Sequence, residues 1–388
     1  MSVLNLIFEN IEYTLSTSKR LYFIDAVRAF AILMMLQGHF IDTLLEAQYR
    51  DDSYLPYQIW SYFRGITAPT FFTISGLIFT YLLIKAKQKG NSKQRMKKGL
   101  VRGLMLIGIG YALRAPIFEW LMGEFRTYVL VVDVLQCIGL SLILIVALYN
   151  ITFKKTFIFS ILTLIIGVII FSTEPLYRTL EVNNIPLVFT NYISKANGSV
   201  FTIIPWFGYM CFGAFIATLF YKYVERPRFK IATVPGFFVV GLFLIFQSSQ
   251  ILKYLSYKLD FQLLLDVANY NYLYIRLGDV LVLFGVFFLF EKYIKQPLIL
   301  KIGQKTLSIY VIHFIIIYGS FTGIGLNTII GKTLNPWQAI IGAIVFLSTV
   351  CFISFYYVKT NAFVYSGIRK LIDKIKAINN PDTNQNSL

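Results

Sequence analysis

The sequence predicts an all-α membrane protein, a polytopic bundle of about ten transmembrane helices with both termini in the cytoplasm. Hydrophobic residues make up 57% of the 388-residue chain and charged residues only 14%, against about 25% charged in soluble domains. Apolar runs of about 20 residues, long enough to cross a bilayer as helices, recur from end to end. Lysine and arginine gather in alternate connections between these runs.

The apolar runs define the expected spans in chain order, and each run is bounded by charged or turn-forming residues. They cover residues 22–45, 59–84, 99–118, 127–149, 155–172, 201–221, 233–252, 271–291, 304–322 and 336–358. The first run contains two charged residues and no small-residue cleavage site after it. We therefore expect it to remain as a span rather than act as a removable signal peptide.

These spans divide the chain into three parts. Residues 1–21 form a cytoplasmic or interfacial segment with apolar residues at helical spacing. Residues 22–358 form the transmembrane domain. Residues 359–388 form a cytoplasmic tail, expected to be partly disordered because it ends in the polar run NNPDTNQNSL.

The orientation follows from the distribution of basic residues. One set of alternate connections holds 25 of the 36 lysines and arginines and the other holds seven, while the remaining four are arginines inside spans. The positive-inside rule places the richer set, with both termini, in the cytoplasm.

Composition also excludes several classes of function. The net charge of +17 is dispersed over short loops, so it indicates topology and contact with anionic lipid rather than nucleic-acid binding. There are two histidines, and the three cysteines Cys137, Cys211 and Cys351 lie in separate apolar runs. We therefore expect no metal site, no disulfide framework and no tightly bound cofactor.

The first span, FIDAVRAFAILMMLQGHFID, carries four ionisable side chains. With Arg28 as zero, helical geometry places His39 at about +20°, Asp25 at about +60° and Asp42 at about −40°. All four share one stripe, and Arg28 lies about 16 Å closer to the cytoplasm than His39. Asp25 and Arg28 can form a structural pair at the inner interface. Asp42, one turn above His39, is expected to accept a hydrogen bond from its ring, either as a packing contact or to prepare a general base.

Further ionisable residues in later spans are expected at the depth of His39 and indicate a polar chamber that opens outward. They are Arg64, Arg114, Asp133, Arg276 and Asp279. Some of these are expected to be structural pairs. Arg276 with Asp133 or Asp279 is interpreted as an ion pair that locks the bundle.

The ninth span adds a second histidine. Helical spacing places Thr306, Tyr310 and His313 on one face. His313 has two open roles, packing between helices or lining the polar chamber.

Several segments resemble a known group of membrane enzymes. KRLYFIDAVRAFAILMMLQGHF resembles the first helix of transmembrane acyltransferases, with the arginine–ten residues–histidine spacing of the acyltransferase-3 family. The segments ITAPTFFTISGL, VLQCIGLSLIL, IIPWFGYMCFGAF and GQKTLSIYVIHF resemble the bacterial branch related to heparan-alpha-glucosaminide N-acetyltransferase. The sequence departs from the pattern at Ala29, where these families commonly have glycine, and at Arg64.

The resemblance implies an enzyme that transfers an acyl group, expected to be acetyl, from cytoplasmic acyl-CoA to a sugar hydroxyl or an amine across the membrane. It also implies a multi-pass protein of the bacterial cytoplasmic membrane that modifies glycans of the cell envelope. His39 matches the motif histidine and Arg28 the motif arginine.

The physical interpretation assigns roles along this route. Arg28 and the basic residues Lys97, Lys98 and Arg102 are expected to meet the phosphates of acyl-CoA. His39, oriented by Asp42, would deprotonate the acceptor or carry the acyl group itself. Arg64 or Arg276 is expected to stabilise the oxyanion or to bind an anionic acceptor. The full set of expected substrate contacts is Arg64, Arg114, Asp133, Arg276, Asp279 and His313.

A secondary transporter is the main alternative, because an intramembrane polar stripe can also relay protons or substrate. No inverted repeat is evident in the sequence, and no pair of interrupted helices occupies matching positions. The acyltransferase interpretation is therefore favoured.

Overall fold

The computed structural model describes residues 21–124, 127–182 and 184–356 of the chain. Within these residues it is helical, with an isolated bridge between Leu45 and Leu334 and no strand. The predicted all-α class is confirmed. The expected N-terminal segment, apart from Leu21, and the expected tail lie outside the described residues.

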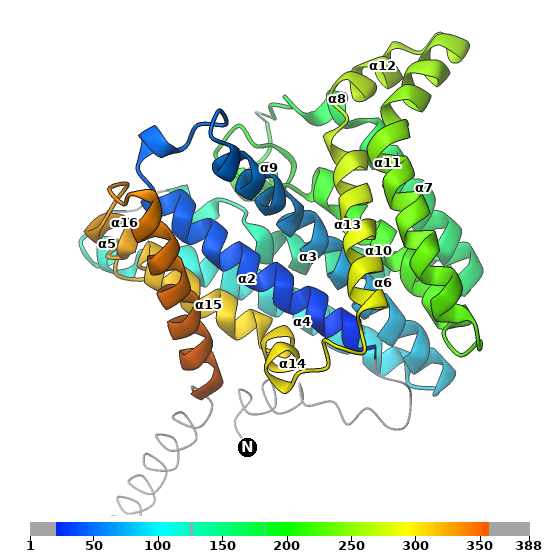
Figure 1. Ribbon diagram of the computed structural model, residues 1–388, viewed down its shortest axis with the longest axis horizontal. Helices are drawn as coiled ribbons and strands as arrows, with labels where there is room; N and C mark the ends of the chain where they lie inside the picture. The colour runs from blue at the N-terminus through cyan, green and yellow to red at the C-terminus, as the bar shows by residue number, and fades with distance from the viewer. Residues whose placement is uncertain (1–20, 125–126, 183, 357–388) are drawn as a thin grey trace, which may run out of the picture.

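The long helices form one bundle (Figure 1). They are α2 (Tyr22–Leu44), α3 (Leu55–Gln88), α4 (Ser92–Arg114), α6 (Val134–Ile151), α7 (Thr156–Ser172), α10 (Ile203–Tyr223), α11 (Phe229–Leu259), α13 (Tyr272–Leu289), α15 (Thr306–Tyr318) and a last helix, Pro336–Tyr356. Shorter helices connect them: η1 (Ala47–Tyr49), α5 (Ile117–Leu121), η2 (Thr127–Leu130), α8 (Glu174–Tyr177), α9 (Leu187–Ile193), α12 (Gln262–Asn269), α14 (Pro297–Gln304) and α16 (Leu326–Ile329).

Each of the ten expected spans coincides with a helix, but fewer qualify as membrane spans by length and composition. Seven of the described helices do so, or eight if the bent pair α14–α15 counts as one span. Two helices do not qualify: α7 has 17 residues, and the first half of α4 is rich in lysine and arginine. The protein is a multi-pass helical membrane protein, and the expected number of ten spans is higher than this count.

The ninth expected span is broken rather than straight. Helices α14 and α15 meet at Lys305 with a bend of 70°. A Cβ on Gly303 would overlap the backbone of Asp25, so glycine permits α14 to pack directly on the first turn of α2. Gly319, with a φ of 66°, then ends α15 in the left-handed conformation that favours glycine.

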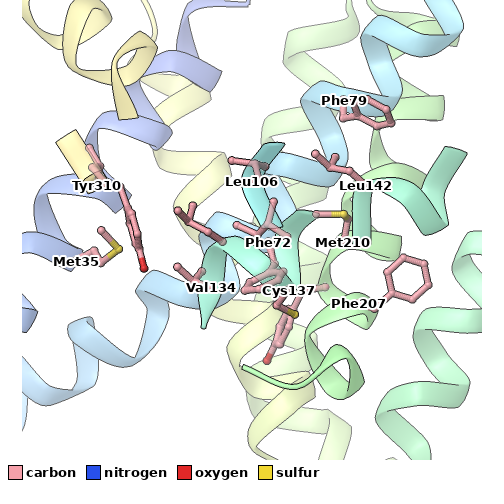
Figure 2. Close-up of a cluster of buried hydrophobic side chains, with 14 of the residues drawn as sticks. Met35, Phe72, Phe79, Leu106, Val134, Cys137, Leu142, Phe207, Met210 and Tyr310 are labelled. Carbon is pink, nitrogen blue, oxygen red and sulfur yellow. The ribbon is translucent and has the colours of Figure 1, made fainter. Parts of the chain in front are cut away.

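The largest cluster of buried side chains includes residues of α2, α3, α4, α6, α10 and α15. Figure 2 shows Phe72 of α3, Leu106 of α4, Val134 and Cys137 of α6, and Met210 of α10 within this cluster. In contrast, α11 and the last helix are largely exposed apolar surface, as expected of helices that face lipid. The close packing of this core cluster therefore holds the residues at the helix ends in fixed positions.

One end of the bundle collects the basic connections. Lys87 in the last turn of α3 donates a hydrogen bond to the carbonyl of Lys154 before α7 (2.6 Å). The ring of Phe355, at the end of the last helix, lies 4.3 Å from the Lys301 ammonium of α14, which packs on the start of α2. The first and last described helices thus begin and end on the same side, and its cytoplasmic location stays a prediction.

Candidate active site

Helices α2 and α15 run side by side in the same direction and are joined by polar contacts at both ends. Near the basic end, the Arg28 guanidinium donates to the Thr306 hydroxyl (2.9 Å). Near the opposite end, His39 Nδ1 lies 2.9 Å from the Tyr318 hydroxyl. Between these contacts, Met35 of α2 and Tyr310 of α15 belong to the same cluster of buried side chains (Figure 2). The two helices therefore form one continuous seam.

Both histidines of the chain meet in this seam. The rings of His39 and His313 have centroids 5.4 Å apart and planes tilted by 36°. His313 is 0% exposed, and neither of its ring nitrogens has a hydrogen-bond partner among the described residues. Tyr310 lies edge-on to it at 4.8 Å. Of the three residues predicted to share one face, Thr306, Tyr310 and His313, the first and last both contact α2.

The hydrogen bond predicted between Asp42 and His39 is contradicted, because the Asp42 carboxylate pairs with other residues. The Asp42 carboxylate accepts a hydrogen bond from Arg50 (2.6 Å) and forms an ion pair with Arg64. Arg50 follows η1, where the chain turns back over the end of α2, and Arg64 extends from α3. Two guanidinium groups bind a carboxylate more strongly than a neutral imidazole does. Tyr318 contacts the histidine instead.

Arg114 and Asp133 form a second ion pair, 2.7 Å long, between the end of α4 and the start of α6. Asp133 is the N-cap of α6 and forms a capping box with Gln136. The Arg114 guanidinium lies 4.8 Å from the ring centroid of Tyr128 and 5.9 Å from that of Phe314 on α15. Because the Phe314 ring lies 6.1 Å from the His313 ring, this pair belongs to the surroundings of the histidines.

Arg276 and Asp279 form a third pair, 3.0 Å long, on α13. Of the two acids expected for Arg276, the structure selects Asp279. Tyr62 of α3 donates to Asp279 (2.7 Å), and Arg276 donates to the carbonyl of Tyr62 (3.2 Å). These contacts join α13 to α3, which agrees with the expected locking role.

Arg64 is more accessible than Arg28, Arg114 and Arg276. Its side chain is 46% exposed and lies 5.7 Å from the ring centroid of Trp60. Its aliphatic part lies beside Gly38, the neighbour of His39 in α2, where an added Cβ would be 3.4 Å from Arg64 Cγ. Arg64 thus bridges the histidine seam and the surface at this end of the bundle.

At the basic end, Arg28 lies 3.7 Å from Asp25, the structural pair that the spacing predicts. Lys97, Lys98 and Arg102 lie on the exposed surface of the first half of α4. The structure joins neither lysine to Arg28 by a contact within the described residues. These cations are therefore a rim around the basic end and not part of the seam.

Sequence reasoning missed Tyr318. It lies about 140° from His313 by helical spacing, away from the stripe that periodicity indicates, and it reaches His39 from the last turn of α15. The sequence of this helix, TLSIYVIHFIIIY, contains several aromatic residues, but their spacing does not indicate a contact between Tyr318 and α2. Among the described residues, no group of three histidine, cysteine or acidic side chains is arranged to hold a metal ion.

Comparison with known proteins supports the acetyltransferase resemblance. A search of curated proteins found no match. The family model described as "heparan-alpha-glucosaminide N-acetyltransferase, catalytic" matches residues 20–259, more than half of the chain. The match covers α2 to α11, with Arg28, His39 and Asp133, and ends before α13 and α15. The chain belongs to the heparan-alpha-glucosaminide N-acetyltransferase catalytic-domain family, a family of membrane acetyltransferases.

Proposed function

We propose that residues 22–358 form an acyltransferase domain that moves an acetyl group from cytoplasmic acyl-CoA to a sugar hydroxyl or amine on the other side of the membrane. The contact between His39 and Tyr318 carries this proposal, because it fixes a histidine in the outer half of a helix whose inner half holds Arg28. The membrane proposed is a bacterial cytoplasmic membrane, with both chain termini inside.

Acyl-CoA is a co-substrate in this proposal. Its phosphates would bind at the basic rim of Lys97, Lys98 and Arg102, and Arg28 would attract the entering arm by its charge. The thioester would then lie along the seam of α2 and α15. The Arg28–Thr306 and His39–Tyr318 contacts mark the two ends of this proposed route.

His39 acts as the base in the direct route. In the tautomer where Nδ1–H donates to Tyr318, Nε2 has a free lone pair that accepts the acceptor's proton. The acceptor oxygen or nitrogen forms a bond to the thioester carbon, the carbon–sulfur bond breaks, and the proton passes from His39 to the leaving sulfur. Tyr318 holds the ring, a role that had been expected of Asp42.

A second route begins with attack by His39 itself on the thioester, which gives an acyl-histidine that the acceptor then consumes. The two routes differ in what happens without acceptor. If acyl-CoA alone yields an acylated His39 peptide by mass spectrometry, the second route holds. If single-turnover conditions yield none while transfer proceeds, the direct route holds.

The roles proposed for four other predicted residues follow from their exposure and their contacts. Arg64 is proposed to bind an acceptor, since it is half exposed near His39. His313 is proposed to line the acyl site beside His39. Arg276 and Asp279 are proposed as structural, because their contacts lie between α3 and α13.

The test compares cells that carry the wild-type chain with cells that carry His39→Ala. Mass spectrometry of their envelope glycans and lipids should show an acylated species that His39→Ala lacks at equal protein level. Purified wild-type protein should also bind acetyl-CoA. The proposal fails if the protein neither binds nor hydrolyses acetyl-CoA and His39→Ala alters solute uptake instead, as a transporter would require.

A further inference from the structure

Three buried nitrogen donors near the histidines have no acceptor. They are Nε and Nη1 of Arg114 and Nε2 of Gln136, and none has a hydrogen-bond partner among the described residues. The Arg114 side chain is 7% exposed and Gln136 is 0% exposed. Buried donors are nearly always paired, since an unpaired one loses its hydration without compensation. Three together indicate a site for an acceptor atom.

Asp133 holds both side chains in this arrangement. Its carboxylate accepts from Arg114 Nη2 (2.7 Å) and from the backbone N–H of Val134 (2.8 Å). Its own backbone N–H donates to Gln136 Oε1 (3.3 Å). Asp133 therefore occupies the amide oxygen of Gln136 and one nitrogen of Arg114. The remaining nitrogens of both side chains are left as donors.

Gly110 sets the position of the Gln136 amide. A Cβ at Gly110 would overlap the Cδ and Oε1 atoms of Gln136, so only glycine lets α6 place this amide against α4. Gly110 and Arg114 are four residues apart on α4 and thus lie on the same face. The two donor side chains are consequently fixed on one patch between α4 and α6.

This patch adjoins the seam. The Arg114 guanidinium lies 5.9 Å from the ring centroid of Phe314, whose ring is 6.1 Å from that of His313 and 4.7 Å from that of Tyr318. The patch therefore reaches the seam through Phe314 of α15.

We infer that Arg114 and Gln136 bind the acyl carbonyl oxygen of the donor and stabilise the oxyanion formed when the acceptor attacks. This inference rests on the proposed acyl transfer. As the new bond to the carbonyl carbon forms, the carbonyl π electrons move to oxygen. The resulting oxyanion accepts hydrogen bonds from the N–H donors. The electrons return when the carbon–sulfur bond breaks and sulfur leaves with its electron pair. Donors that are already in place before the reaction stabilise this negative charge and so lower the activation barrier.

Gln136 offers an informative pair of variants. Gln136→Glu keeps the oxygen that caps α6 but replaces the donor NH₂, whereas Gln136→Met removes both. If the amide only caps the helix, Gln136→Glu retains activity. If it binds the carbonyl oxygen, both variants lower kcat by about 100-fold while the KM for acetyl-CoA changes little.

A spectroscopic measurement separates binding of the carbonyl from a loss of fold. Full-length His39→Ala protein is loaded with acetyl-CoA carrying ¹³C at the carbonyl, and the isotope-edited infrared band is recorded. We expect a carbonyl band at lower frequency than in water. The frequency should return toward the solution value when His39→Ala is combined with Gln136→Met, which removes the amide. The same return is expected when it is combined with Gly110→Ala, which displaces the amide without changing it. Asn271→Leu, which removes a buried amide between α11 and α13, is the matched control and should leave the band unchanged.

The outcomes distinguish this inference from the proposed function. If acetyl-CoA does not bind and no band appears, the proposed function fails. If the band appears but keeps one frequency in all variants, Arg114 and Gln136 do not bind the carbonyl oxygen. If Gln136→Met does not fold, Gly110→Ala and Gln136→Glu carry the same test.

Discussion

Tyr318 holds the ring of His39 from 279 residues away in the sequence, with 2.9 Å between its hydroxyl oxygen and the imidazole Nδ1. The contact replaces the carboxylate that the sequence suggested. A tyrosine hydroxyl can donate to or accept from the ring, and so it fits either tautomer of the histidine. The ring of Phe314, 4.7 Å away, supports the tyrosine in turn.

Tyr318→Phe should lower kcat for acyl transfer by about 10- to 100-fold, because the histidine ring loses the contact that orients it. The KM for acetyl-CoA should change little. Tyr293→Phe, at an exposed tyrosine, is the matched control and should retain full activity. Equal rates for Tyr318→Phe and wild type would remove Tyr318 from the mechanism.

Asp42→Asn should affect stability more than chemistry. Its carboxylate pairs with Arg50 and Arg64 rather than with His39. Because these groups are partly exposed, we expect a loss of about 1 kcal/mol in unfolding free energy and a kcat within about threefold of wild type. Thermal melting and steady-state rates of the purified protein measure the two effects. Loss of activity at wild-type stability would instead restore Asp42 as the orienting residue.

Single changes at the Arg276–Asp279 pair should destabilise the protein strongly. Both side chains are largely buried and tie α13 to α3, so removing one partner leaves an unpaired charge, at a cost of about 3–5 kcal/mol. Asp279→Asn should therefore melt well below the double variant Arg276→Met with Asp279→Leu. A double-mutant cycle on unfolding in detergent provides the measurement. Additive effects would show that the pair is not coupled.

Cysteine labelling in intact cells tests the orientation. Ser53→Cys, in the exposed connection before α3, should react with a membrane-impermeant maleimide, whereas Lys93→Cys, in the exposed first turn of α4, should react only after lysis. The background is low because Cys137 and Cys211 are buried, and removal of Cys351 lowers it further. The reverse pattern would place the basic end outside.

The sequence predicted much of the seam because helical periodicity is a local property. The spacing of Arg28 and His39 on α2 defined one face, and that of Thr306 and His313 defined another. The structure packs these faces together. Their pairing follows from apolar burial and from the cost of ionisable groups facing lipid.

Periodicity did not reveal contacts made at helix ends, where the chain leaves its regular geometry. Arg50 reaches Asp42 because η1 folds back after α2. Tyr318 reaches His39 from the last turn before Gly319. The bend at Lys305 depends on the close packing of Gly303 against α2, a tertiary contact that no local pattern encodes.

The break between α14 and α15 also limits the length of α15. Helix α15 has 13 residues and so rises about 20 Å, against about 30 Å for the hydrocarbon core of a bilayer. Because α14 turns aside by 70°, the straight part of this span is shorter than the hydrocarbon core. Under the proposed acyl transfer, a thioester arm that follows α15 would therefore have less depth to cross before it meets an outer acceptor.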